Sequence, residues 1–268
     1  MLYPKRRVEG AFDSFAEEYD NVAGKSMTFF AGLLIRDLQI PENPRVLDVG
    51  CGTGVSTFQL MREVQGRGMF YGLDISQKML DLARRRAADL GYANVEFKKG
   101  DAEQLDFPES SFDLVISNQA FFFFSDKQKA LNEMLRVLRP TGQVALLFFA
   151  EPSLKEIKEI YVKVRNRHTK HVTPKISLKL IDLEETNELF DRSGFKKTRI
   201  FGIHQIDYVD PSKYIATLES PQSLFRINLA SELAEIVIKE TKEEMMRAKT
   251  GKGFKVTTCY ILAYGQKA

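Results

Sequence analysis

Residues 45–54 read R-V-L-D-V-G-C-G-T-G, and this stretch decides the fold. Its first half is a short apolar run with β-branched residues and helix-breaking flanks, which predicts a buried parallel strand. Gly50, Gly52 and Gly54 predict a turn at which the backbone approaches a ligand without a Cβ in the way. Apolar residues then recur at helical spacing over residues 55–61. A strand, a glycine turn and a helix N-terminus together indicate a nucleotide-binding corner, although a tight structural turn also fits the pattern.

Glycine spacing distinguishes between nucleotides. The dinucleotide pattern is G-x-G-x-x-G, whereas this chain has G-x-G-x-G with Val55 where the third glycine would stand. Asp48 adds a carboxylate at the end of the strand, and a negative group suits a cationic ligand better than a pyrophosphate. A phosphate-binding P-loop is excluded too, because Tyr19 stands where the first glycine should precede Gly24-Lys25-Ser26. The spacing therefore disfavours an NAD-linked oxidoreductase.

Alternating strand and helix patterns continue along the chain and predict an α/β fold. Apolar runs predict strands over residues 46–49, 68–74, 94–99, 112–118, 143–150, 195–203 and 254–264. Helical periodicity predicts helices over residues 9–20, 29–38, 55–61, 77–90, 126–138, 154–164, 183–193, 211–219 and 231–249. In the first helix the aromatic residues fall on one face and the acidic residues on the other. Residues 139–142 read as the stop between a helix and the fifth strand.

Composition sets the class of protein. The chain has 268 residues, 44% of them hydrophobic, which suits one sizeable α/β domain with accessory helices. No apolar stretch is long enough to span a membrane, and no apolar segment follows the basic N-terminus as in a secretory signal. Cys51 and Cys259 are the only cysteines, so we expect no disulfide, no metal site and a reducing, cytoplasmic setting. A net charge of +3 does not by itself indicate nucleic-acid binding.

The run V-L-D-V-G-C-G-T-G resembles motif I of the class I S-adenosylmethionine-dependent methyltransferases, and later motifs match in order and spacing from Phe12 to about Phe149. F-D-x-x-A-x-x-Y-D at residues 12–20 resembles the small-molecule members that act in quinone and biotin biosynthesis, and L-R-V-L-R-P-T-G-Q-V-A-L at residues 135–146 is typical of the family. The resemblance implies a doubly wound, seven-stranded, mostly parallel, Rossmann-like sheet with an antiparallel last strand and accessory helices as a cap. It also implies S-adenosyl-L-methionine as the cofactor.

The same resemblance divides the chain into three regions. Residues 1–40 are expected to form an N-terminal helical cap segment, residues 41–150 the S-adenosylmethionine-binding core, and residues 151–268 the completion of the sheet with substrate-covering helical insertions. The implied function is methyl transfer to an oxygen or carbon of a small organic acceptor, anionic or apolar. A non-catalytic adenosyl-ligand-binding protein is the alternative, and the polar strand end at residues 117–119 favours the enzyme. The oligomeric state is left open.

Nucleic acid is an unfavoured substrate. Amino-methylating nucleic-acid enzymes of this fold grip a flipped base with an Asn/Asp-Pro-Pro-aromatic tetrad. Residues 118–121 read N-Q-A-F, without the prolines. An RNA methyltransferase is therefore less favoured than a small-molecule enzyme.

The resemblance implies cofactor contacts at the carboxyl ends of the strands. Asp74 stands where a carboxylate accepts both ribose hydroxyls, while Ser76 is the expected N-cap of the next helix. Asp101 is expected to accept from the adenine amine and Ala102 to donate its N–H to the ring, whereas Glu103 is expected to be solvated or helix-initial. The predicted cofactor-binding residues are Tyr19, Asp48, Gly50, Cys51, Gly52, Asp74, Ile75, Met79, Asp101, Ala102, Ser117 and Asn118.

The acceptor side is less constrained. Residues 121–124 are four consecutive phenylalanines that divide between core packing and a pocket wall, with Phe122 or Phe123 as the wall residue. Residues 165–171 are basic, as in a solvated loop, and also suit an anionic acceptor. Residues 12–19 and 157–171 are expected to close over the site. The predicted substrate-pocket residues are Phe12, Gln119, Phe122, Phe123 and His168. No catalytic residue is assigned, and the candidate general bases are His168, His171, His204 and Tyr19.

Overall fold

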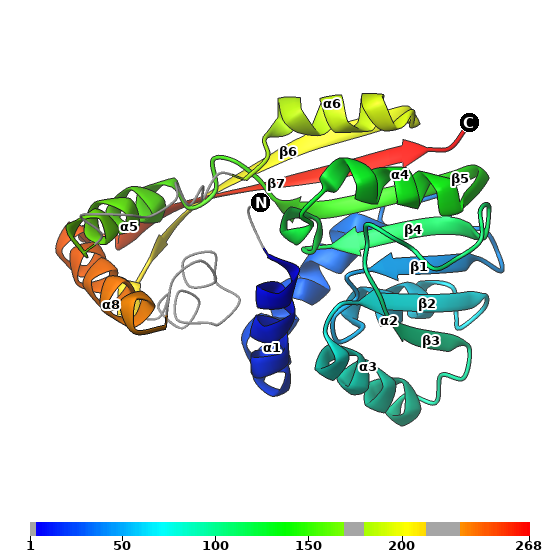
Figure 1. Cartoon of the computed structure of the whole chain (residues 1–268), viewed down its shortest axis with the longest axis horizontal. Coiled ribbons are helices and arrows are strands. Elements are labelled where there is room, and N and C mark those ends of the chain that lie inside the picture. The colour runs from blue at the N-terminus through cyan, green and yellow to red at the C-terminus, as the bar shows by residue number, and fades with distance from the viewer. Residues whose placement is uncertain (1–3, 169–179, 213–230) are drawn as a thin grey trace.

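Seven strands form one sheet in the order β3-β2-β1-β4-β5-β7-β6 in the computed structural model, which describes residues 4–168, 180–212 and 231–268 (Figure 1). Neighbouring strands are parallel from β3 to β5, while β7 is antiparallel to both β5 and β6. This confirms the predicted doubly wound sheet with an antiparallel last strand. The strands are β1 Arg45–Val49, β2 Met69–Asp74, β3 Val95–Lys99, β4 Phe112–Asn118, β5 Leu138–Phe149, β6 Lys196–Val209 and β7 Phe254–Gln266.

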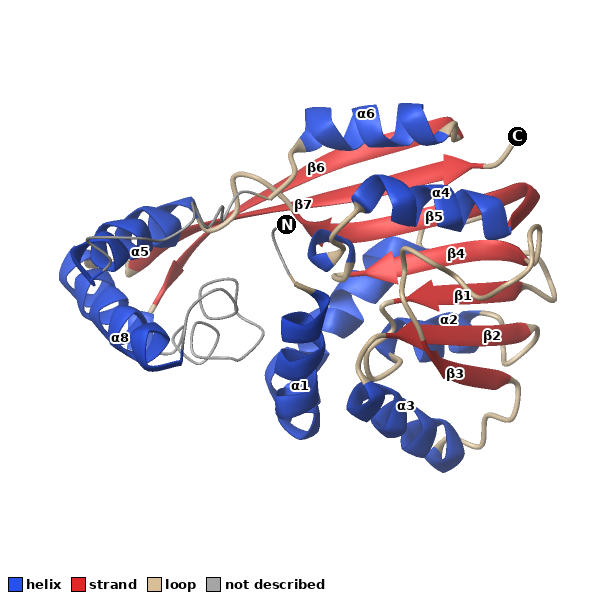
Figure 2. Ribbon diagram, viewed as in Figure 1, coloured by secondary structure: helices blue, strands red, loops and turns tan. Residues whose placement is uncertain are grey.

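Both faces of the sheet are covered by helices, as the blue and red ribbons of Figure 2 show. Successive strand residues point to opposite faces, so Val46 joins one buried cluster while Leu47 joins the other. Burial on both faces is why the strand stretches read as almost unbroken apolar runs. The helices are α1 Lys5–Ile35, α2 Val55–Glu63, α3 Gln77–Asp89, α4 Lys127–Val137, α5 Lys155–His168, α6 Leu183–Ser193 and α8 Ser231–Ala248, with a 3-10 turn, η1, at Phe121–Phe123.

The structure corrects two predicted elements and leaves a third undescribed. The helices predicted for residues 9–20 and 29–38 are one continuous helix, α1. The predicted stop at residues 139–142 belongs to β5, which begins at Leu138 and changes register against β4, with Thr141 in the left-handed region at φ 64°. The helix predicted for residues 211–219 lies outside the described residues from 213 onward.

Strands β6 and β7 extend far beyond the sheet body and carry α5 and α8 at their outer end (Figure 1). The pairing of β5 with β7 ends at Phe149 opposite Tyr260, whereas β6 pairs with β7 as far as Val209 opposite Phe254. Buried Tyr161 on α5 belongs to the same apolar cluster as residues of α8. Within the described part of the chain, no helix is both long and apolar enough to cross a membrane.

Candidate active site

The glycine turn after β1 is fastened to the end of β2. The N–H groups of Gly50 and Cys51 both donate to the carbonyl of Leu73, at 2.7 and 3.0 Å. A Cβ at Gly50, where φ is 75°, would lie 2.3 Å from the Cβ of Ala120, so no larger residue fits. A Cβ at Gly52 would meet nothing within 4 Å, and Gly52 lines a cavity. The turn therefore combines a sterically forced bend with backbone that is open to a ligand.

Asp74 ends β2 with its carboxylate held by backbone N–H groups. Its Oδ2 accepts from Gly52 N–H and its Oδ1 from Ser76 N–H, both at 2.8 Å. Burial raises the pKa of Asp74, against the lowering effect of these N–H groups. The hydroxyl of Ser76 accepts from Met79 N–H, so Ser76 is the N-cap of α3 as predicted.

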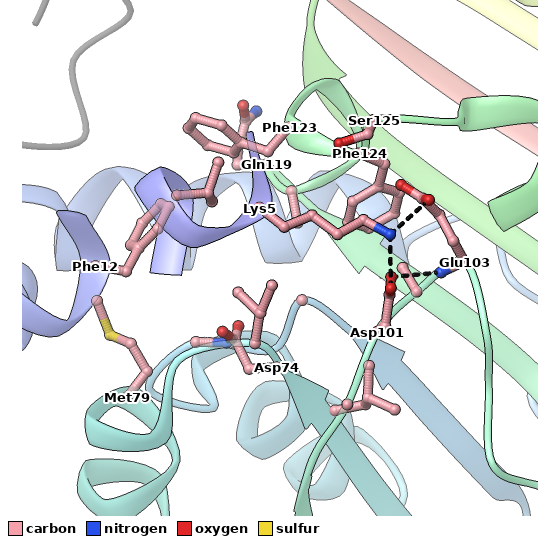
Figure 3. Close-up of a pocket in the computed structure, with 18 of the residues that line it drawn as sticks. Lys5, Phe12, Asp74, Met79, Asp101, Glu103, Gln119, Phe123, Phe124 and Ser125 are labelled. Atoms are coloured by element: carbon pink, nitrogen blue, oxygen red, sulfur yellow. Dashed lines mark hydrogen bonds and ion pairs between the residues drawn. The ribbon is translucent and has the colours of Figure 1, made fainter. Parts of the chain in front are cut away.

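A cavity lies where the strand order reverses, between the carboxyl ends of β1, β2 and β4 and the first half of α1 (Figure 3). Its space measures about 740 Å³ when the open solvent at its mouth is included. Three predicted substrate-pocket residues line it, namely Phe12, Gln119 and Phe123. The predicted cofactor-binding residues that line it are Tyr19, Gly50, Gly52, Asp74, Ile75, Met79, Asp101, Ala102 and Asn118.

Three predicted cofactor-binding residues do not line the cavity. Asp48 is buried under the glycine turn, where its Oδ2 accepts from the Thr57 hydroxyl at 2.6 Å and its Oδ1 has no partner among the described residues. Ser117 is buried too, and its hydroxyl donates to the carbonyl of Val49 at 2.7 Å. Cys51 packs into the apolar cluster on the α2 face. These side chains position the turn and strand ends.

The phenylalanine run divides between core and cavity. Phe121 packs against Phe148 and Phe122 against Phe149, with ring centroids 4.9 and 5.9 Å apart. Phe123 and Phe124 line the cavity instead. Phe122, one of the two predicted wall residues, therefore does not line the cavity.

Lys127 holds the phenylalanine run in place. Its ammonium group donates to the carbonyls of Phe122 and Phe124, at 3.2 and 2.9 Å. Burial lowers the pKa of Lys127 to about 8. The Lys127 ammonium group therefore stabilises the η1 turn, which places Phe123 and Phe124 at the cavity.

Lys5, which the sequence analysis did not select, closes one end of the cavity. Its ammonium group lies 2.6 Å from Asp101 Oδ2 and 2.6 Å from Glu103 Oε2 (Figure 3). Burial lowers the pKa of Lys5, but the hydrogen bonds to the two carboxylates outweigh it and leave the pKa above its usual value. Glu103 is buried and also accepts from Asp126 N–H, so its predicted exposure was wrong. Lys5 is 96 residues from Asp101 in the chain, and no local pattern marks such a contact.

Polar contacts hold α1 across the strand ends. Glu9 pairs with Lys99 at 2.6 Å, and Asp13 accepts from the Ser76 hydroxyl at 2.6 Å. Asp20 accepts from the Thr53 hydroxyl at 2.7 Å and pairs with Arg86. The acidic face of the helix therefore contacts the core instead of pointing only to solvent. These contacts place Phe12 and Tyr19 of α1 at the cavity.

The candidate bases lie elsewhere or are unsuited. His168 on α5 lies 2.7 Å from Glu240 on α8, and His204 on β6 lies 3.7 Å from Cys259 Sγ. Neither histidine lines the cavity, and α5 does not cover it. His171 lies outside the described residues. Tyr19 does line the cavity, but burial, with the charges of Asp74 and Asp20, raises its pKa, so the phenol remains protonated.

Comparison with known proteins gives consistent matches. The methyltransferase domain family matches residues 40–176, slightly more than half of the chain. The demethylmenaquinone methyltransferase of Staphylococcus aureus is 31% identical over 161 residues, which cover 59% of this chain and 66% of that protein, just under two thirds of its length.

Solved structures share the fold. The YcgJ protein of Bacillus subtilis matches with a TM-score of 0.63 at 22% identity, over 89% of this chain and 98% of that one. A Haemonchus contortus phosphoethanolamine N-methyltransferase 2, solved with phosphomonomethylethanolamine and S-adenosylhomocysteine, matches with a TM-score of 0.62 at 18% identity, over 97% of this chain and 61% of that one. At these identities the likeness is one of fold alone.

We predict that Asp48→Asn changes the stability of the protein more favourably at pH 8 than at pH 5, when the variant is compared with wild type at each pH. Burial raises the pKa of Asp48 to about 7, while the Thr57 hydrogen bond opposes the shift and the charge of Asp74 adds to it. Between about pH 4 and pH 7 the native state binds a proton that the unfolded state has released, so wild-type stability falls as pH rises through that window. Asparagine does not ionise, so the variant does not lose this stability as the pH rises. Each kcal/mol of unfolding free energy that the variant keeps at pH 8 corresponds to about 2–4 °C in melting temperature.

The measurement is thermal unfolding of wild type and variant at pH 5 and pH 8. The control is Asp89→Asn, which removes an exposed carboxylate from α3. If the melting temperatures of Asp48→Asn and wild type differ by the same amount at pH 5 and pH 8, then Asp48 does not titrate with a raised pKa.

We predict that Lys5→Met loosens the first turns of α1, because it removes both ion pairs with Asp101 and Glu103. A loss of about 1 kcal/mol in local opening free energy corresponds to roughly five-fold faster amide exchange. Hydrogen exchange read by mass spectrometry over residues 5–12 measures it. Lys25→Met, an exposed lysine on the same helix, is the matched control. Unchanged exchange in Lys5→Met would show that the pairs do not anchor the helix.

Proposed function

The chain belongs to the class I S-adenosylmethionine-dependent methyltransferases, and from this premise we propose that it transfers a methyl group from S-adenosylmethionine to a small organic acceptor. The observation that carries the proposal is the cavity at the strand switch point, with carboxylates at the ends of two neighbouring strands. Asp74 ends β2, and Asp101 follows β3.

The residues present fit the cofactor. The space beside Gly52 admits a ligand against bare backbone, and the partly buried Asp74 carboxylate keeps acceptor capacity beyond its two N–H contacts. In this proposal Asp74 binds the ribose hydroxyls, and Asp101 with the N–H of Ala102 binds the adenine. Asn118 also lines the cavity, and its Oδ1 is unpaired among the described residues. Asp48 does not contact the cofactor in this proposal; it lies beneath the turn and accepts a hydrogen bond from the Thr57 hydroxyl.

The cofactor supplies an electrophilic methyl carbon on a sulfonium. In the transfer the acceptor's electron pair forms a bond to that carbon, the carbon–sulfur bond breaks, and its electron pair stays on a neutral sulfur. The chain has no developing anion to stabilise, so its residues contribute by orienting the reactants and excluding water. Such positioning is worth about 7–11 kcal/mol. Tyr19, held protonated, offers a hydrogen-bond donor at the cavity.

We further propose an apolar aromatic acceptor that bears a hydroxyl, of the kind that a demethylated quinol presents. The apolar end of the cavity supports this class, since Phe12 and Phe123 meet edge to face with centroids 5.3 Å apart. The name of the Staphylococcus aureus relative supports it as well. An acceptor hydroxyl must lose its proton in the reaction, and it releases that proton to solvent at the open mouth of the cavity, because the histidines of the described residues lie outside the cavity.

We predict that Asp74→Ala weakens S-adenosylhomocysteine binding by about 1.5–3 kcal/mol, the range for hydrogen bonds to a charged group. Isothermal titration calorimetry measures it, and thermal unfolding confirms that the variant is folded. Asp81→Ala, an exposed carboxylate on α3, is the matched control. An unchanged dissociation constant in Asp74→Ala would show that Asp74 does not bind the ribose.

The transfer itself is tested with S-adenosylmethionine labelled on the methyl group. We expect label to appear in demethylmenaquinol, and none in phosphoethanolamine or transfer RNA. Label in phosphoethanolamine alone would overturn the proposed acceptor but keep the activity. Tight binding of S-adenosylmethionine without transfer to any tested acceptor would favour a binding protein instead.

A further inference from the structure

Gln119 carries two features that oppose folding. It follows β4 directly with its backbone in the left-handed region at φ 56°, and only 8% of its surface is exposed. Neither its Oε1 nor its Nε2 has a hydrogen-bond partner among the described residues. An unpaired buried amide and a positive φ outside glycine both cost stability. Such costs persist at sites that serve a ligand.

The backbone fixes where this amide lies. Gln119 N–H donates to the carbonyl of Leu147 at 2.6 Å, which continues the β4–β5 ladder past the strand end. Figure 3 shows Gln119 beside Phe123, at the end of the cavity opposite Asp74 and Met79. The amide therefore stands at the apolar end, away from the carboxylates assigned to the cofactor.

The neighbouring polar group cannot replace it. Asn118 uses its Nδ2 to donate to the Met27 carbonyl at 3.3 Å and to the Ser56 hydroxyl at 3.0 Å, which leaves only its Oδ1 unpaired. Gln119 thus offers both a donor and an acceptor for a ligand in this part of the cavity. Because both amide atoms are buried, a ligand reaches them only after neighbouring side chains move.

This inference rests on the proposed function and deepens it. We propose that Gln119 is the residue that recognises the acceptor, with Oε1 accepting from an acceptor hydroxyl and Nε2 donating to an acceptor oxygen. A neutral amide among phenylalanine rings selects an uncharged aromatic hydroxyl compound. An ammonium or carboxylate acceptor would lose its hydration there without gaining an opposite charge.

The test compares two naphthalenes that differ in one hydroxyl, 4-methoxy-1-naphthol and 1,4-dimethoxynaphthalene. Each is titrated calorimetrically into the full chain, alone and saturated with S-adenosylhomocysteine. We expect wild type to bind the naphthol about 10-fold more tightly, as one hydrogen bond allows. Gln119→Leu and Gln119→Met should lose this preference without a lower melting temperature. Gln77→Leu, a glutamine at the start of α3 outside the cavity, should keep it.

Equal affinity of wild type for the two compounds, binding of neither, or a preference that survives in both Gln119 variants would each overturn the inference. The experiment reads binding and not turnover, so it is independent of the transfer assay. A chain that prefers the naphthol but transfers no methyl group would refute the proposed activity and support the role of Gln119. A chain that methylates phosphoethanolamine and binds neither naphthalene would refute both the aromatic acceptor and the role of Gln119, while the methyltransferase activity would stand.

Discussion

The hydrogen bond from Gly52 N–H to the Asp74 carboxylate is the contact on which the site depends. It joins the turn after β1 to the end of β2, beside the two N–H donors that Gly50 and Cys51 give to the Leu73 carbonyl. These bonds join two strand ends and hold the partly buried Asp74 carboxylate beside the bare backbone of Gly52. A side chain at Gly50 would collide with Ala120, which follows β4, so the same turn also sets the third strand end.

Around this unit the cavity has two chemically different ends. One end is charged, with Asp74, Asp101 and Lys5, and the other is apolar, with Phe12 and Phe123. A polar nucleoside-type ligand suits the first end and an aromatic acceptor the second. The α1 helix contributes to both ends, because Lys5 pairs with Asp101 while Phe12 and Tyr19 line the cavity. Ion pairs between partly exposed groups are screened by salt, so the docking of α1 depends on ionic strength.

The sequence predicts those parts of the site that local patterns determine. The glycine spacing forces the turn, and the carboxyl ends of parallel strands meet at one edge, so Asp74, Asp101 and Asn118 come together as expected. Side chains alternate between the two faces of a strand, so Asp48 lies beneath the turn on the α2 face, like Val46, and does not line the cavity. Lys5 and the displaced α5 depend on contacts between distant segments, and on how far β6 and β7 extend, which periodicity does not encode.

The most direct test of the account is a crystal structure of the chain with S-adenosylhomocysteine. The account predicts the ribose hydroxyls on Asp74, the adenine beside Asp101 and Ala102, and the sulfur directed toward Asn118 and the apolar end with Phe123. The ligand bound at another site, or bound here in the reverse direction with its adenine against Phe123, would contradict it.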